Sequence, residues 1–236
     1  MLSGFPFEFV ISLGVDCRVR FQISRFFDAL RALPPDERSL AGGEALAHAL
    51  TGTNLFDWNM VWFSGVIKAI ENRFDGLFIR DALKEMPKNA TIVVDGRYEI
   101  MYSHIFSRSE GQTFADMIDA QYPKAAKLVL FLKDKLVSHF EAENPTIYIR
   151  CQGNEQEAQQ FCQAMRANYP MHRFHLVLVD VQDATAGFVA RHENYSIYRM
   201  TGKVNKPPEA VWTGDDEEWT ALFRQIGDET RLPGPV

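Results

Sequence analysis

The stretch Glu8–Arg20, EFVISLGVDCRVR, is the part of the chain from which the fold is argued. Its first half, Phe9–Leu13 (FVISL), is a short apolar run typical of a strand, and Gly14 ends it. The segment after Asp16 has helical spacing. We therefore expect Cys17 within one turn of a helix N-terminus, where backbone N–H groups and the helix dipole favour a thiolate.

Two interpretations of Cys17 follow from this position. A strand, a glycine turn, a cysteine and a helix form an arrangement that often presents a nucleophile at the carboxyl edge of a sheet. The alternative is a small apolar side chain under the sheet, which is where most free cysteines lie. Position alone favours the second interpretation and leaves the first open.

The composition of the 236 residues is ordinary for a globular protein, with 46% hydrophobic and 24% charged residues. A net charge of −6 argues against a nucleic-acid partner, which would need a concentrated basic face. No apolar run is long enough to span a bilayer, and the first residues lack the features of a signal peptide. We expect no membrane partner and a cytoplasmic location. Three cysteines, an odd number, do not predict a disulfide framework.

Apolar periodicity predicts several helices in the first 140 residues, at 16–33, 61–74, 78–86 and 113–140, the last with a possible break at Pro123. On the longest of these, an apolar stripe is expected, made of Leu128, Phe131, Leu132, Leu136 and Phe140. Between them, Ala90–Phe106 predicts a β-hairpin with Asp95-Gly96 as its tight turn.

The second half of the chain has a different pattern. A strand at Thr146–Arg150, a helix at Asn154–Tyr169 and a strand at Phe174–Asp180 form a βαβ unit, which favours parallel strands and a right-handed crossover. A last strand is expected at 195–201 and a closing helix at 217–226. The prediction is one α/β domain over residues 1–236 with a short flexible C-terminal tail. It has a mixed sheet with helices on both faces, a hairpin at about 91–106 and a βαβ unit at about 146–180.

The sequence contains no Walker loop, no dinucleotide fingerprint, no HExxH and no paired CxxC. Cys151, Cys162, His172 and His175 match no standard zinc spacing. We therefore expect neither a cofactor nor a metal.

A cysteine hydrolase would need an imidazole near the thiol and a group that orients the imidazole. His104 is the best candidate, because it lies at the end of the predicted hairpin; the alternative is a half-buried strand histidine. For the orienting group, Asp57 and Asp180 both remain open. Arg150 ends a strand, where it could bind an anion or, as we favour, pair with an acid across the sheet.

Four segments carry a resemblance to a known family: Ser12–Cys17 (SLGVDC), Phe56–Trp58 (FDW), Tyr102–Phe106 (YSHIF) and Tyr148–Arg150 (YIR). Over roughly residues 9–180, the chain resembles an uncharacterised bacterial family described as papain-like cysteine peptidases. The resemblance implies a thiol-dependent chemistry centred on Cys17. The sequence departs from the family pattern at Leu55, where a proline is usual, and at Ile105.

Two functions are carried forward. The first is a thiol-dependent hydrolase or acyltransferase that acts on an amide, ester or thioester of a small molecule or peptide, with Cys17 as nucleophile, His104 as base and acid, and Asp57 as orienting carboxylate. The second is a non-catalytic or glycosyltransferase-like binder of a phosphate or sugar-phosphate, held by the loops at the sheet edge and by Arg150.

Overall fold

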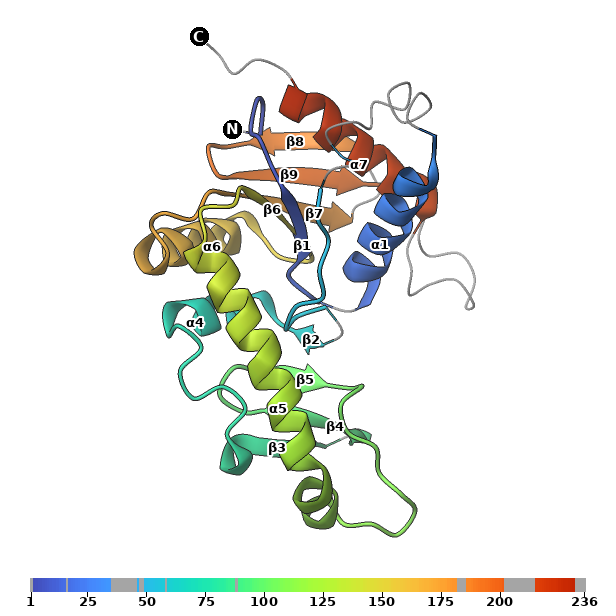
Figure 1. Cartoon of the computed structure of the whole chain (residues 1–236), viewed down its shortest axis with the longest axis vertical. Coiled ribbons are helices and arrows are strands. Elements are labelled where there is room, and N and C mark those ends of the chain that lie inside the picture. The colour runs from blue at the N-terminus through green and yellow to red at the C-terminus, as the bar shows by residue number, and fades with distance from the viewer. Residues whose placement is uncertain are drawn as a thin grey trace.

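The computed structural model describes residues 2–15, 17–34, 46, 49–57, 59–87, 89–181, 186–201 and 215–231. Over these residues the strands form two sheets, with the five-stranded sheet above the four-stranded one in Figure 1. The first sheet has the order β1-β6-β7-β9-β8, and its strands are β1 (Phe9–Ser12), β6 (Thr146–Cys151), β7 (Phe174–Val181), β9 (Tyr195–Met200) and β8 (Gly187–Arg191). The second has the order β2-β5-β4-β3, and its strands are β2 (Met60–Val61), β5 (Ile100–Tyr102), β4 (Asn89–Asp95) and β3 (Leu83–Met86).

The five-stranded sheet is mixed. β1, β6, β7 and β9 pair in parallel, and β8 pairs antiparallel with β9. Alternate residues of β6 face opposite sides: Ile147 and Ile149 pack with α1 (Cys17–Ala32) and α7 (Asp216–Arg231), whereas Tyr148 packs with α6 (Glu155–Asn168). The predicted α/β fold, with helices on both faces and a βαβ unit, is confirmed.

The chain leaves β1 and β6 toward opposite sides of this sheet. After β1 it forms α1 on one face and returns to Leu50, which makes a parallel bridge with Phe9 on the side of β1 away from β6. After β6 it forms α6 on the other face and continues into β7. Adjacent strands whose connections diverge in this way create a crevice at their carboxyl ends, where open α/β sheets bind ligands.

The four-stranded antiparallel sheet contains the predicted hairpin, which therefore lies outside the mixed sheet to which it was assigned, and the turn of the hairpin also differs from the prediction. The strands β4 and β5 are joined by the four residues 96–99 rather than by a two-residue turn. The buried Asp95 carboxylate explains this, because it accepts hydrogen bonds from the backbone N–H groups of Arg97 and Tyr98, at 2.8 and 3.4 Å, and so stabilises the wider loop.

The helix predicted at 78–86 is wrong. A short 3₁₀ turn at Arg80–Ala82 leads into β3, which pairs with β4. The residues of β3, Leu83–Met86, have a weak preference for a helix. Hydrogen-bonded pairing with β4 outweighs this preference. β8, which the sequence analysis did not predict, is likewise an outer strand supported by pairing with β9.

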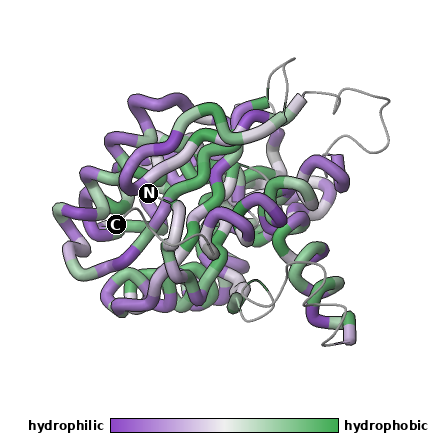
Figure 2. Tube along the Cα trace, turned by 90° about the horizontal axis from the view of Figure 1, so that it is seen from above, coloured by the Kyte–Doolittle hydropathy of each residue, from purple (hydrophilic) through white to green (hydrophobic). Residues whose placement is uncertain are grey.

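The other predicted helices are confirmed with small shifts of their ends. α4 covers Phe63–Glu71, α5 covers Phe114–Glu141 without interruption at Pro123, and α7 is longer than expected. α5 runs past both sheets (Figure 1), and hydrophobic segments of the trace gather toward the interior in Figure 2. In the part of the chain that the structure describes, no helix is both long and apolar enough to cross a bilayer. The predicted tail at 232–236 lies outside the described residues.

Candidate functional site

Cys17 and His104 lie together although 87 positions separate them in the chain. α1 begins at Cys17, five positions after β1 ends at Ser12, and His104 follows the last residue of β5 by two positions. The Cys17 Sγ and His104 Nε2 atoms are 3.5 Å apart, within hydrogen-bond range for sulfur. Cys17 is partly buried and His104 is exposed, so the pair lies at the surface, beyond the carboxyl end of β1.

The turn that carries Cys17 has an unusual backbone. Gly14 has φ of +79°, and a Cβ at this position would lie 3.0 Å from the Phe56 carbonyl oxygen and from Val61 Cγ1. Val15 has φ of +89°, a conformation that β-branched residues rarely adopt and that costs about 1–3 kcal/mol. Strain of this kind concentrates at functional sites, where the surrounding structure maintains it.

Arg150 is positioned beneath this turn. Its side chain is 1% exposed, and its guanidinium donates to the Leu13 carbonyl oxygen at 2.7 Å and to the Val61 carbonyl oxygen at 2.8 Å. It also lies over the Phe63 ring, 5.1 Å from its centre. Leu13 precedes the Cys17 turn and Val61 belongs to β2, so Arg150 joins the two sheets at the base of the site.

The described hydrogen bonds of Arg150 give it a structural role in addition to the two roles weighed from the sequence. An anion arriving from solvent has no access to a guanidinium that is 1% exposed, and the hydrogen bonds described above go to backbone carbonyls rather than to an acid across the sheet. The physical reason is that a buried arginine is stabilised wherever several oxygens fit its planar fork, and the ends of β1 and β2 present two such oxygens.

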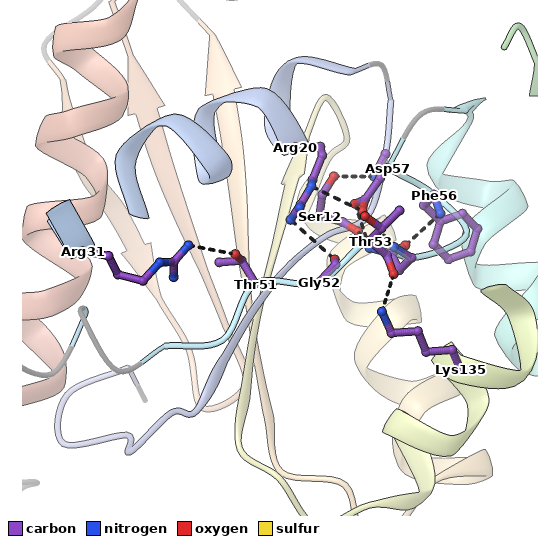
Figure 3. Close-up of polar contacts among 11 residues, drawn as sticks. Ser12, Arg20, Arg31, Thr51, Gly52, Thr53, Phe56, Asp57 and Lys135 are labelled. Carbon is purple, nitrogen blue, oxygen red and sulfur yellow. Dashed lines mark hydrogen bonds and ion pairs between the residues drawn. The ribbon is translucent and has the colours of Figure 1, made fainter. Parts of the chain in front are cut away.

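Asp57 holds the loop that packs against this turn, and Figure 3 shows its carboxylate beside Arg20. One carboxylate oxygen accepts from the Asn54 backbone N–H and the other from the Asn54 side-chain amide, both at 2.8 Å. That amide also donates to the Ser12 carbonyl oxygen at 3.1 Å, at the end of β1. Arg20 Nε lies 3.6 Å from the carboxylate. The carboxylate thus ties the 54–57 loop to β1 and α1.

Asp57 does not occupy the position expected for a carboxylate that orients the His104 imidazole. Among the described residues, the hydrogen bond of the His104 ring is the one to Cys17. The carboxylate of Asp57 is engaged with Asn54 and Arg20, and that of Asp180 lies 4.0 Å from Arg199. The geometry presents a Cys–His pair rather than a triad over these residues.

Burial raises the pKa of the Asp57 carboxyl to about 7, against the opposing effects of the Arg20 charge and the Asn54 hydrogen bonds. The folded chain then keeps a proton that the unfolded chain releases between about pH 4 and pH 7, so the free energy of unfolding falls across that interval. Asp57→Asn cannot ionise at this position. We expect its free energy of unfolding to rise by about 3 kcal/mol relative to that of the wild type as the pH increases from about 4.5 to about 7.5.

Urea unfolding of both proteins at several pH values measures this gain. His139 and His175, whose pKa values burial lowers to about 4 and about 3, titrate in both proteins and cancel in the comparison. Parallel stability curves for the two proteins would show instead that Arg20 keeps Asp57 ionised throughout.

The other two cysteines lie away from solvent. Cys151 is 4% exposed on β6 and Cys162 is 5% exposed on α6. Burial raises the pKa of the Cys162 thiol to about 12. Over the described residues, no group of three or more metal-ligating side chains is gathered.

The structure brings together Cys17 and His104, the two residues proposed from the sequence, whereas the backbone conformation of Val15 and the carbonyl contacts of Arg150 were not predicted. No sequence signal marks a valine for a left-handed conformation, although its place directly after Gly14 in a strand-to-helix turn is suggestive. Trp58, part of the FDW segment, lies outside the described residues. Comparisons of the chain with family models, with curated proteins and with solved structures each find no match.

Proposed function

We propose that this protein is a thiol-dependent hydrolase or acyltransferase that acts on an amide, ester or thioester. The observation that carries the proposal is the 3.5 Å contact between Cys17 Sγ and His104 Nε2 at the carboxyl edge of the five-stranded sheet. A nucleophile within reach of an imidazole, at a helix start and in a strained turn, is the combination that covalent acyl transfer needs.

The chemistry assigns one role to each side chain. The Cys17 sulfur attacks the carbonyl carbon of the substrate while its proton passes to His104 Nε2, which gives a tetrahedral oxyanion. His104 then returns the proton to the leaving amine, alcohol or thiol as the bond to the carbonyl carbon breaks, and a thioester on Cys17 remains. Water, or another acceptor, gives its proton to His104 as it attacks the carbonyl carbon of the thioester. The C–S bond then breaks, and His104 returns the proton to the Cys17 sulfur as the acyl product departs.

Asp57 has a supporting role in this proposal. It stabilises the loop against which the Cys17 turn packs, through Asn54 and the end of β1, and takes no part in proton transfer. The exposed His104 ring is oriented through its contact with the thiol, and solvent can bond its other nitrogen. The phosphate-binding alternative is less well supported, because its expected anchor, Arg150, is buried.

The test uses p-nitrophenyl acetate, an activated ester. We expect a burst of about one p-nitrophenolate per chain and an acetyl group on the Cys17 peptide by mass spectrometry. Cys17→Ser should lose the burst, and His104→Gln should slow it by about 10²-fold or more, the usual contribution of a general base. Cys162→Ser, a change at a buried thiol on α6, is the matched control and should keep the burst. Acetylation of lysines alone, unchanged by Cys17→Ser, would reject the proposal.

A further inference from the structure

A groove adjoins the Cys17–His104 pair. One of its walls is the segment 104–107, which includes His104 itself, and the other is a face of α5 that includes Lys124, Lys127, Leu128 and Phe131. The groove encloses about 810 Å³, within the usual range for small-molecule sites. Because His104 contacts Cys17 and also lines the groove, the groove begins beside the Cys17–His104 pair.

The groove is held in shape by hydrogen bonds between its two walls. The Ser107 backbone N–H donates to the Gln121 side-chain oxygen at 3.0 Å, and the Gln121 amide donates to the Ser107 carbonyl oxygen. The groove-lining part of α5 extends from Ala120 to Phe131, a length of about 16 Å at the helical rise of 1.5 Å per residue. An extended chain can contact the whole length of this wall.

The lining is apolar with positive charge. Leu128 and Phe131 are 48% and 62% exposed, although the sequence pattern placed both on one apolar stripe with Leu136 and Phe140. Leu136 and Phe140 are buried, together with Ala125 and Val129. Lys124 and Lys127 are exposed, and no acidic side chain lines the groove in the described part of the chain. Apolar side chains left uncovered beside a reactive pair commonly contact a ligand.

We propose that the groove binds one arm of the substrate, and that this arm is an apolar chain that carries a negative charge. The chain covers Leu128 and Phe131, and the anionic group meets Lys124 and Lys127. This assignment rests on the proposed function, since it names the substrate class for the same Cys17–His104 pair. Lysines are suited to a flexible anionic end, because each offers a compact charge on a mobile stem.

The test measures the rate at which Cys17 is alkylated by four reagents: iodoacetamide, its N-hexyl derivative, 6-(iodoacetamido)hexanoic acid, and the matching terminal amine. Each forms a C–S bond and releases iodide, so no substrate needs to be known. We expect the hexyl reagent to react about tenfold faster than iodoacetamide, because its methylenes leave water on Leu128 and Phe131. The carboxylate reagent should react about threefold faster than the amine at low salt, and this preference should shrink at high salt.

Two variants locate these effects. Phe131→Ser should reduce the ratio of hexyl to plain reagent toward one, and Lys127→Glu should reverse the preference for carboxylate over amine. The matched controls are Leu130→Ser and Lys68→Glu, and both should retain the two ratios. Leu130 is a 40% exposed residue of α5 outside the groove lining, and Lys68 lies on α4.

The outcomes separate the two proposals. If Cys17 fails to react with plain iodoacetamide, the result contradicts the proposed function itself. If Cys17 reacts equally with all four reagents, the proposed function is retained and the groove assignment is wrong. The same holds if sedimentation shows a dimer that Phe131→Ser dissociates while the ratios stay at one, because the apolar face would then serve self-association.

Discussion

Iodoacetamide at neutral pH is expected to modify Cys17 at least about 100-fold faster than Cys151 or Cys162 in the folded chain. Cys17 is partly exposed, lies at the start of α1 and contacts the His104 imidazole, and each of these features favours thiolate at an accessible position. Cys151 and Cys162 are 4% and 5% exposed, and the pKa of Cys162 is raised to about 12, which leaves almost no thiolate there.

Mass spectrometry of peptides after timed labelling measures the three rates separately. In urea the three thiols should react at similar rates, which shows that the selectivity belongs to the fold. His104→Gln should slow the labelling of Cys17 in the native protein. His139→Gln is the comparison variant, because His139 is hydrogen-bonded to Thr146 instead of to Cys17. Equal rates for all three cysteines in the folded chain would remove the basis for a nucleophilic Cys17.

The second large effect concerns Arg150. Its replacement by Met removes the donors that serve the Leu13 and Val61 carbonyl oxygens, and each buried acceptor left unpaired costs about 1–3 kcal/mol. We expect Arg150→Met to lower the free energy of unfolding by about 3 kcal/mol or more. Arg150→Lys should also be strongly destabilising, because one ammonium group cannot reproduce the planar fork that reaches both carbonyls.

Urea unfolding with a constant m-value measures this loss. Arg166→Ala is the matched control, since Arg166 is exposed on α6 and pairs with Glu193 at the surface, where an ion pair contributes about 0–1 kcal/mol. If Arg150→Met and Arg166→Ala lose similar amounts of stability, Arg150 does not join the sheets in the way inferred. Thermal stabilisation of the wild type by inorganic phosphate that Arg150→Lys abolishes would instead support the anion-binding alternative.

The regular elements were predictable where one physical signal dominated. The strand–glycine–helix pattern of Phe9–Arg20 and the βαβ unit from Thr146 are confirmed, because apolar periodicity and turn residues agree there. The segment 78–86 was mistaken for a helix, since its local preferences are weak and pairing with β4 decided its conformation. The stripe on α5 was partly misassigned, because periodicity shows that apolar residues share a face without showing what covers it.

The candidate site also divides into features that the sequence predicts and features that only tertiary contacts decide. Its two residue types and the place of Cys17 at a helix start follow from the sequence, because glycine turns and helix starts are local features. The meeting of Cys17 with His104, the burial of Arg150 under the turn and the engagement of Asp57 with Asn54 follow from the fold alone.

What the sequence determined by itself was therefore an α/β chain with a thiol presented after its first strand. The tertiary structure decided which imidazole reaches that thiol, which charged groups are committed to holding the turn, and which apolar side chains remain open to a ligand. The physical reason is range: secondary structure depends on neighbours within a few residues, whereas these contacts join segments up to 137 positions apart, whose proximity depends on how the strands pair and how the two sheets pack.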